Sequence, residues 1–237
     1  MNWRLIISGP GAPEEQMEAD RRLLEALSGG GPATWRLYAW DPWAISIGHN
    51  QDAARDLDLD RCRRDGIPVV RRPTGGRAVY HADELTYAVA IPQSPFLPEG
   101  TAGPYDIIAG ILVDAIRSLG VDARSGSVSG APAGAHQGAC FASATRHEIL
   151  AEGRKLVGSA LRRTRDGVLQ HGSILIGPAH AALGRYLAPP VPEDWLLRRA
   201  TCLHDLLGSG VTRDDVARAV ERAVEVRWGA PLECVGA

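Results

Sequence analysis

The sequence predicts an α+β fold in which a mixed, mainly antiparallel β-sheet is flanked by helices. Two observations predict this class. Strand-like segments come in clusters joined by short turns, and the clearest turn is Asp166-Gly167, a dipeptide typical of β-hairpins. Segments with a helical apolar period, such as residues 105–119, separate these clusters. The 237 residues are 45% hydrophobic, which is enough for one sizeable domain with its own core.

Short strands alternate with helices in the first half of the chain. Residues 1–8 and 34–39 are predicted as strands, and residues 13–27 as a helix that the glycine triplet 29–31 ends. The remaining elements of this half are strands at residues 43–47, 68–71 and 85–91 and a short helix at residues 59–65.

The second half is predicted to contain a long loop and a hairpin between helices. Residues 105–119 carry one apolar stripe and form the clearest helix. Residues 124–139 are rich in Gly, Ser and Ala, so we expect a loop with too few apolar side chains to pack by itself. The later elements are strands at residues 147–151, 155–163 and 168–176 and helices at residues 203–207 and 211–226.

Composition excludes several classes of protein. The net charge of −2 argues against nucleic acid as a partner. No apolar run approaches the roughly 20 residues of a membrane helix, so we expect no membrane association. The apolar start at residues 1–8 is too short for a signal peptide, and we therefore expect a cytoplasmic protein.

The four cysteines are widely scattered and include no CxxC pair, so no zinc or other metal site is expected. A reducing compartment also disfavours disulfides. Any functional cysteine must therefore act alone. Cys62, Cys202 and Cys234 are expected to have no catalytic role.

Lys155 is the only lysine among the 26 lysine and arginine residues. Arginine supplies the same charge as a broad planar fork, whereas lysine is a compact donor on a flexible stem. A position that stays lysine in such a background indicates an ammonium fitted to a tight site. The alternative is a surface lysine without a function. Its setting, Gly-Arg-Lys-Leu-Val-Gly-Ser-Ala at residues 153–160, favours the first interpretation.

The segment Arg-Arg-Pro-Thr-Gly-Gly-Arg-Ala-Val-Tyr-His, residues 71–81, lies between two predicted strands. Paired glycines allow backbone N–H groups to approach a ligand, and the flanking arginines supply charge for a phosphate or a carboxylate. The spacing matches neither a Walker loop nor a dinucleotide-binding fingerprint. An ordinary turn is the alternative interpretation.

Glycines also interrupt the two strands of the predicted hairpin. Gly158 lies in the first strand, and Gly172 follows His171 in the second. Glycine inside a strand often marks a bulge or a ligand that lies against the backbone. His171 by itself is equally compatible with a hydrogen-bonded core histidine.

Cys140 ends the small-residue loop and is the cysteine that we expect solvent and substrate to reach. A thiol needs a nearby cation or base to become a nucleophile, and the candidates are Lys155, Arg146 and His147. The alternative is a small hydrophobic residue at the start of a strand.

Together these motifs resemble the catalytic domain of the biotin/lipoate protein ligase family, in the branch of lipoate–protein ligase A and the LipM-type octanoyltransferases. The resemblance runs from about Trp35 to the last helix. It implies that the Gly-Gly segment and the Lys155 strand enclose an acyl chain, whose carbonyl Lys155 holds. The implied substrate-binding residues are Arg72, Thr74, Gly75, Gly76, Arg77, Ala78, His81, Gly158, Ser159, Ala160, His171 and Gly172.

The resemblance also implies a reaction. Cys140-Phe141 matches the place of a cysteine that takes the acyl group as a thioester, although Ala142-Ser143-Ala144-Thr145 departs from the expected Asp-Ala-Pro-Ser. With Cys140 and Lys155 as catalytic residues, an octanoyl group would pass from acyl carrier protein to a lysine of a lipoyl-domain protein, such as the glycine-cleavage H protein. No cofactor is then required. The family's C-terminal accessory domain is expected to be absent, which leaves one catalytic domain over residues 1–237.

Two other functions stay open. The chain would be a lipoate–protein ligase if it used ATP and Mg²⁺ to form lipoyl-AMP, with Arg72 and the Gly-Gly segment holding the adenylate. A non-catalytic carrier or chaperone for lipoyl proteins would need neither Cys140 nor Lys155.

Overall fold

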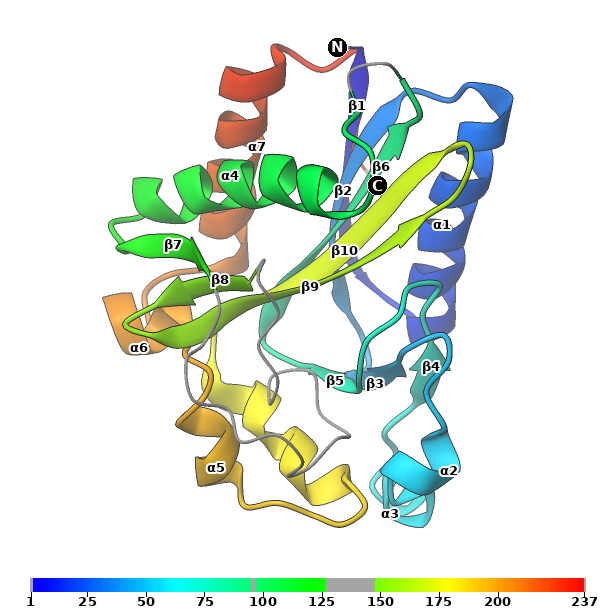
Figure 1. Ribbon diagram of the computed structural model, residues 1–237. Helices are drawn as coiled ribbons and strands as arrows, with labels where there is room; N and C mark the ends of the chain where they lie inside the picture. Colours follow the sequence, from blue (N-terminus) through cyan, green and yellow to red (C-terminus); the bar gives the residue numbers. More distant parts are fainter. Residues whose placement is uncertain (1, 95–96, 127–147, 237) are drawn as a thin grey trace.

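The computed structural model describes residues 2–94, 97–126 and 148–236. Its main element is an eight-stranded sheet with the order β11-β1-β2-β6-β10-β9-β8-β7 (Figure 1). The first two pairings of this order are parallel, and the other five are antiparallel. The strands are β1 (Trp3–Gly11), β2 (Ala33–Trp40), β6 (Glu84–Pro92), β7 (Ala123–Gly126), β8 (Glu148–Ala151), β9 (Arg154–Arg163), β10 (Gly167–Leu175) and β11 (Glu233–Gly236). The prediction of a mixed, mainly antiparallel sheet is confirmed.

A second, three-stranded sheet has the order β4-β3-β5, with β3 (Ala44–Ile47) between β4 (Val69–Arg71) and β5 (Val79–His81). Strand β3 pairs parallel with β4 and antiparallel with β5. This small sheet is inserted between β2 and β6, which are neighbours in the large sheet. The Gly-Gly segment, residues 71–81, includes the whole connection from β4 to β5. The topology therefore brings it close to the large sheet.

Helices cover both faces of the large sheet (Figure 1). Helices α4 (Ala102–Ser118) and α7 (Arg213–Trp228) pack together on one face, while α1 (Pro13–Ala26) contacts β2, β6 and β10 on the other. The shorter helices are η1 (Leu27–Gly29), α2 (Ala53–Asp56), α3 (Leu59–Arg64), η3 (Pro178–Tyr186), α5 (Glu193–Leu197) and α6 (Leu203–Leu207).

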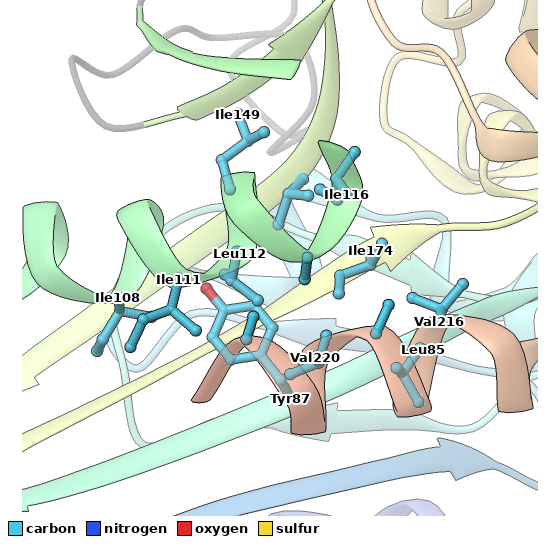
Figure 2. Close-up of a cluster of buried hydrophobic side chains, with 14 of the residues drawn as sticks. Leu85, Tyr87, Ile108, Ile111, Leu112, Ile116, Ile149, Ile174, Val216 and Val220 are labelled. Atoms are coloured by element: carbon cyan, nitrogen blue, oxygen red, sulfur yellow. The ribbon is translucent and has the colours of Figure 1, made fainter. Parts of the chain in front are cut away.

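The sequence of β6 explains how one strand serves both layers. Leu85 and Tyr87 point to the α4–α7 side, where they join the main hydrophobic core (Figure 2). Ala88 and Ala90 belong to the cluster under α1. Successive side chains of a strand point to opposite faces. Large residues therefore fill the space under two helices, and alanines let α1 approach closely.

Local signals define the ends of the longest helices. Pro13 occupies the first turn of α1, where a missing N–H costs no intrahelical hydrogen bond. Helix α7 begins with a capping box, in which Thr212 and Asp215 each accept a hydrogen bond from the other's backbone N–H. It ends at Gly229, whose φ of 83° only glycine adopts without strain.

The structure corrects the sequence prediction at several elements. Residues 124–126 form part of β7 and pair with β8, because backbone hydrogen bonds hold a strand that has few apolar side chains. The rest of the predicted loop lies outside the described residues. The elements η1, α2, β5, η3, α5 and β11 were not predicted. All of them except η3 have five residues or fewer, which is too short to show a clear hydrophobic period.

None of the helices in the described ranges is both long and apolar enough to cross a membrane. That residues 1–237 form a single catalytic domain without an accessory domain stays a prediction.

The hairpin of β9 and β10 carries the predicted glycines on adjacent strands. In its register Ser159 lies opposite Gly172, and Gly158 lies opposite Ser173. A Cβ added at Gly172 would lie 2.2 Å from the carbonyl oxygen of Gly158 and 2.9 Å from the ring of Tyr87. The hairpin therefore has no room for a side chain at residue 172.

We expect Gly172→Ala to lower the free energy of unfolding by about 1–3 kcal/mol, because the strands must separate to admit the methyl group. Urea unfolding followed by circular dichroism measures the change. Gly75→Ala is the control, since a Cβ there would meet no described atom within 4 Å. Equal stability of the two variants would contradict the packing described for the hairpin.

Candidate active site

A small cavity of about 30 Å³ lies where the β9–β10 hairpin, α1 and the three-stranded sheet meet. It has room for about two water molecules. Seven of the predicted substrate-binding residues surround it, namely Arg72, His81, Gly158, Ser159, Ala160, His171 and Gly172. The other lining residues are Met17, Tyr38, Trp40, Ser46, Val79, Thr86 and Ser173.

The ring of His81 closes one wall, and both of its nitrogens are hydrogen-bonded. Its Nδ1 lies 2.8 Å from Glu84 Oε1, and its Nε2 lies 2.7 Å from Ser46 Oγ. Trp40 stacks on the ring with 4.1 Å between the centroids. Glu84 Oε1 also accepts hydrogen bonds from the hydroxyls of Ser173 and Thr86.

His171 forms a second wall and is also fully hydrogen-bonded. Its Nδ1 lies 2.9 Å from Asp20 Oδ2, and its Nε2 lies 2.5 Å from Thr74 Oγ1. Burial lowers the pKa of His171, and the neighbouring Asp20 carboxylate opposes that shift. The imidazole is therefore neutral at pH 7.

These hydrogen bonds give the cavity its chemical character. Many of its lining side chains are polar, yet the ring nitrogens of both histidines are occupied by partners within the wall. A polar group whose hydrogen bonds are complete presents little demand for water. The cavity consequently offers ring faces, methylene groups and glycine backbone to a ligand, which suits an apolar chain.

Tyr87 links the β9 side of the cavity, at Ser159, to the main hydrophobic core (Figure 2). Its hydroxyl lies 2.6 Å from Ser159 Oγ and accepts a hydrogen bond from Gln170 Nε2 at 3.0 Å. Burial raises the pKa of Tyr87 to about 12, so the phenol stays protonated. The contact fixes the Ser159 side chain and with it the middle of β9.

The buried side chain of Arg72 holds the Gly-Gly segment through hydrogen bonds to its backbone. Its guanidinium donates to the carbonyl oxygens of Gly75 at 2.9 Å and Arg77 at 2.7 Å, and to Ser46 Oγ at 3.1 Å. Gly76 has a φ of 95°, a conformation that favours glycine. The buried guanidinium thus folds the segment back on itself.

The other predicted residues of this segment differ in position. Gly75 and Gly76 are exposed, and a Cβ added at Gly76 would lie 3.9 Å from the Cβ of Ala160. Thr74 is buried against His171. Ala78 packs in the hydrophobic cluster of the small sheet rather than along the cavity.

Lys155 is buried at the start of β9, with only 1% of its surface exposed. Lys155 is therefore not a surface lysine, and that part of the alternative interpretation is wrong. The Nζ atom lies 2.8 Å from Glu148 Oε1 on the neighbouring strand β8. Its backbone is held by the carbonyl of Arg199 and the N–H of Thr201, each at 2.9 Å.

The described lining of the cavity does not include Lys155. Gly158 follows it by three residues on the same strand, a distance of about 10 Å. Lys155 therefore lies beyond one end of the lining stretch of β9 instead of inside the cavity.

Cys140 lies outside the described residues, as do Arg146 and His147. Burial raises the pKa of the thiols of Cys62 and Cys202, the latter to about 11, which disfavours their thiolates. Both pack in the hydrophobic clusters, and that they are not catalytic stays a prediction. Cys234 is exposed on β11.

The sequence analysis missed Asp20, Glu84 and Glu148. One signal existed for Asp20, because it lies three residues after Met17 and three before Leu23, on the apolar stripe of α1. A buried carboxylate on such a stripe demands partners. Glu84 and Glu148 stand at strand starts, where an acidic residue carries no distinctive signal.

No group of three or more His, Cys, Asp or Glu side chains in the described ranges is arranged to hold a metal ion.

Comparison with known proteins identifies the family of this chain. The model of the lipoyl protein ligase A/B catalytic domain matches residues 12–225. The chain belongs to this family. Two similar proteins named Octanoyltransferase LipM come from Kyrpidia tusciae and Geobacillus kaustophilus, at 39% and 38% identity. Each alignment covers 98% of this chain, together with 89% of the first relative and 88% of the second.

Solved lipoate-protein ligases share the fold. A lipoate-protein ligase A bound with ATP superposes with a TM-score of 0.81 at 23% identity, covering all of this chain and 90% of the other. A bi-partite lipoate protein ligase from Thermoplasma acidophilum superposes with a TM-score of 0.77 at 21% identity, covering all of this chain and 88% of the other. At these identities the likeness confirms the predicted fold.

The buried Lys155–Glu148 pair leads to a prediction about stability. Glu148→Gln leaves a buried ammonium without this carboxylate, so we expect the free energy of unfolding to fall by about 3–5 kcal/mol. The double variant Glu148→Gln/Lys155→Met removes both charges and is expected to recover part of the loss.

Urea unfolding of the single and double variants measures these changes. Asp114→Asn, which breaks an exposed pair with Arg227, is the control and should cost less than about 1 kcal/mol. A Glu148→Gln variant no less stable than this control would show that the buried pair has no energetic importance.

Proposed function

We propose that this chain is an octanoyltransferase of protein lipoylation. Curated relatives that align over 98% of the chain carry the name Octanoyltransferase LipM, and they confirm the expectation of an acyltransferase enzyme. In our proposal the donor is octanoyl acyl carrier protein. The acceptor is a lysine of a lipoyl-domain protein, such as the glycine-cleavage H protein.

One observation carries the assignment to this site. A buried ammonium, Lys155, and a cavity whose polar walls are internally hydrogen-bonded follow one another along β9. This order suits an acyl group, because the ammonium can bind the carbonyl oxygen while the chain extends past Gly158 toward Ala160. Lysine fits such a narrow end better than the broader guanidinium of arginine.

The first chemical step forms an acyl-enzyme. The thiolate of Cys140 attacks the carbonyl carbon of the octanoyl thioester, and the oxygen of the tetrahedral intermediate gains a negative charge. Lys155 donates a hydrogen bond to that oxygen and stabilises the charge. The carbon–sulfur bond to the carrier breaks, and the carrier leaves as a thiolate that takes a proton from solvent.

The second step transfers the acyl group. The neutral ε-amine of the acceptor lysine attacks the octanoyl-cysteine, an amide bond forms, and Cys140 leaves as a thiolate. The amine gives up one proton to solvent. An amide is more stable than a thioester, so the two steps together need neither ATP nor another cofactor.

The proposal assigns the remaining predicted residues to binding. Gly158, Ser159, Ala160, His171 and Gly172 would lie along the acyl chain. An octanoyl chain is larger than two water molecules, so its entry requires the walls to move outward. The exposed Gly75–Gly76 turn, which lies beside Ala160, would then border the widened cavity.

The environment of the proposed reaction follows from composition. A net charge of −2 gives nucleic acid no role. We propose that the enzyme acts in the cytoplasm without a membrane partner. An ATP-dependent lipoate ligase is less supported, since the relatives aligned over nearly the whole chain are named as transferases.

Octanoyl acyl carrier protein, mixed with the purified chain without ATP, is expected to yield one octanoyl adduct on Cys140 and then acylated H protein. Intact-mass measurement detects both products, and neutral hydroxylamine should remove the adduct because it is a thioester. Cys140→Ala is expected to lose adduct and product, whereas Cys234→Ala, which removes the exposed thiol of β11, should keep them.

Product that appears only with ATP and free octanoate, without an adduct, would replace the transferase by a ligase. Absence of acyl transfer under both conditions would favour a non-catalytic carrier or chaperone.

A further inference from the structure

A carboxylate with no exposed surface, Asp20, lies beneath the candidate site. Its Oδ1 accepts a hydrogen bond from Arg36 Nη1 at 2.9 Å. Its Oδ2 accepts from the Tyr38 hydroxyl at 2.8 Å and faces His171 Nδ1 at 2.9 Å. Three donors, two from β2 and one from β10, therefore hold one carboxylate on α1 in a single orientation.

This arrangement determines which nitrogen of His171 carries the proton. An ionised carboxylate can only accept hydrogen bonds, so Nδ1 must donate to Asp20. The imidazole is neutral, and its Nε2 therefore has a lone pair. Thr74 Oγ1, at 2.5 Å, donates to that lone pair. The chain of hydrogen bonds runs in one direction, from Thr74 through His171 to Asp20.

Thr74 connects this chain to the segment over the cavity. It directly precedes Gly75 and Gly76, and its carbonyl accepts a hydrogen bond from the N–H of His49 at 2.8 Å. Its side chain anchors the same turn to the large sheet through His171 on β10. The position of the Gly-Gly turn beside Ala160 thus depends on a contact that Asp20 orients.

A role in packing alone would not require a charged group here. Burying the Asp20–Arg36 pair carries a desolvation penalty, and a buried ion pair is often replaceable by apolar residues without loss of stability. A carboxylate differs from those replacements because it specifies the tautomer of the histidine beside it.

We propose that Asp20 is a positioning residue for octanoyl transfer, which acts through His171 and Thr74 to hold the Gly75–Gly76 turn against the acyl chain. The inference rests on the proposed function. Asp20 itself does not touch the reacting atoms, and its effect is carried by the direction of two hydrogen bonds.

Asp20→Asn tests the direction of these bonds at nearly constant shape. An amide N–H cannot accept from Arg36 Nη1, so the amide oxygen will face Arg36. The amide nitrogen will face His171 and the Tyr38 hydroxyl, which then accepts instead of donating. The amide then donates to Nδ1, the proton moves to Nε2, and the bond to Thr74 reverses. Nitrogen-15 NMR of the histidine rings, recorded without octanoyl acyl carrier protein, distinguishes the two tautomers.

The same variant is expected to lose between about tenfold and a hundredfold in kcat/KM for octanoyl transfer, the effect of a small displacement of a substrate-contacting wall. Arg21→Gln is the control, because Arg21 is the next residue of α1 and points to solvent, where it pairs with Glu18. It should keep both the wild-type tautomer and the wild-type rate.

Two variants at Thr74 separate positioning from stability. Thr74→Val keeps the shape and removes the hydroxyl, so we expect it to lose transfer to the same extent as Asp20→Asn. Thr74→Ser keeps the hydroxyl and should lose less. Urea unfolding of every variant ensures that rates are compared on folded protein.

A reversed tautomer in Asp20→Asn, together with a larger loss of transfer in Thr74→Val than in Thr74→Ser, would support the inference. Retention of the Nδ1 proton, a wild-type rate with a reversed tautomer, or equal losses in Thr74→Ser and Thr74→Val would each overturn it. A wild-type chain that transfers no octanoyl group would instead overturn the proposed function, and with it the role of Asp20 in that reaction.

Discussion

The antiparallel pairing of β9 with β10 is the constraint on which the candidate site depends. Its register sets Ser159 opposite Gly172 and Gly158 opposite Ser173, where no larger side chain fits at residue 172. The resulting hollow becomes a cavity because α1 and the small sheet cover it. The same strand carries Lys155 near its start, where it pairs with β8 instead of β10, so β9 connects the cavity wall to the ammonium.

Two buried ion pairs border this strand pair, Lys155 with Glu148 and Arg36 with Asp20. Burial of charge is costly, and natural proteins retain such departures from simple packing mainly at functional sites. The two pairs differ in what they offer. In our proposal Lys155 donates to a substrate oxygen, whereas Asp20 accepts from donors within the protein and acts on its neighbours.

Much of the fold was predictable from the sequence. The Asp166-Gly167 turn indicated the β9–β10 hairpin, and periodic apolar residues indicated α1, α4 and α7. Two strands of the small sheet, at residues 43–47 and 68–71, were predicted. Nothing in a single sequence shows that they pair, and the third strand, at residues 79–81, was not predicted. Strand β7 was missed, since its backbone pairing compensates for side chains that suggest a loop.

The candidate site residues were chosen where a residue type was unusual for its setting, and their roles stay predictions. The sole lysine and the glycines inside strands are of this kind, and the structure brings Gly158, Gly172, His171 and His81 around one cavity. The carboxylates that orient these groups were missed, because their importance follows from contacts between residues far apart in the chain. Asp20 and His171, 151 positions apart, are the clearest case.

Shared fold does not decide the reaction, since a lipoate-protein ligase A bound with ATP superposes on the whole of this chain with a TM-score of 0.81. The central claim is that the Lys155 ammonium acts on an acyl carbonyl at the end of β9. The most direct test is the octanoyl transfer rate of Lys155→Arg beside Arg163→Lys, the reverse exchange on the same strand. Arg163 donates to Gln93 and Pro98, outside the described lining of the cavity. We expect a loss of at least about a hundredfold for the first and little change for the second. A Lys155→Arg enzyme that transfers at nearly the wild-type rate would contradict the claim.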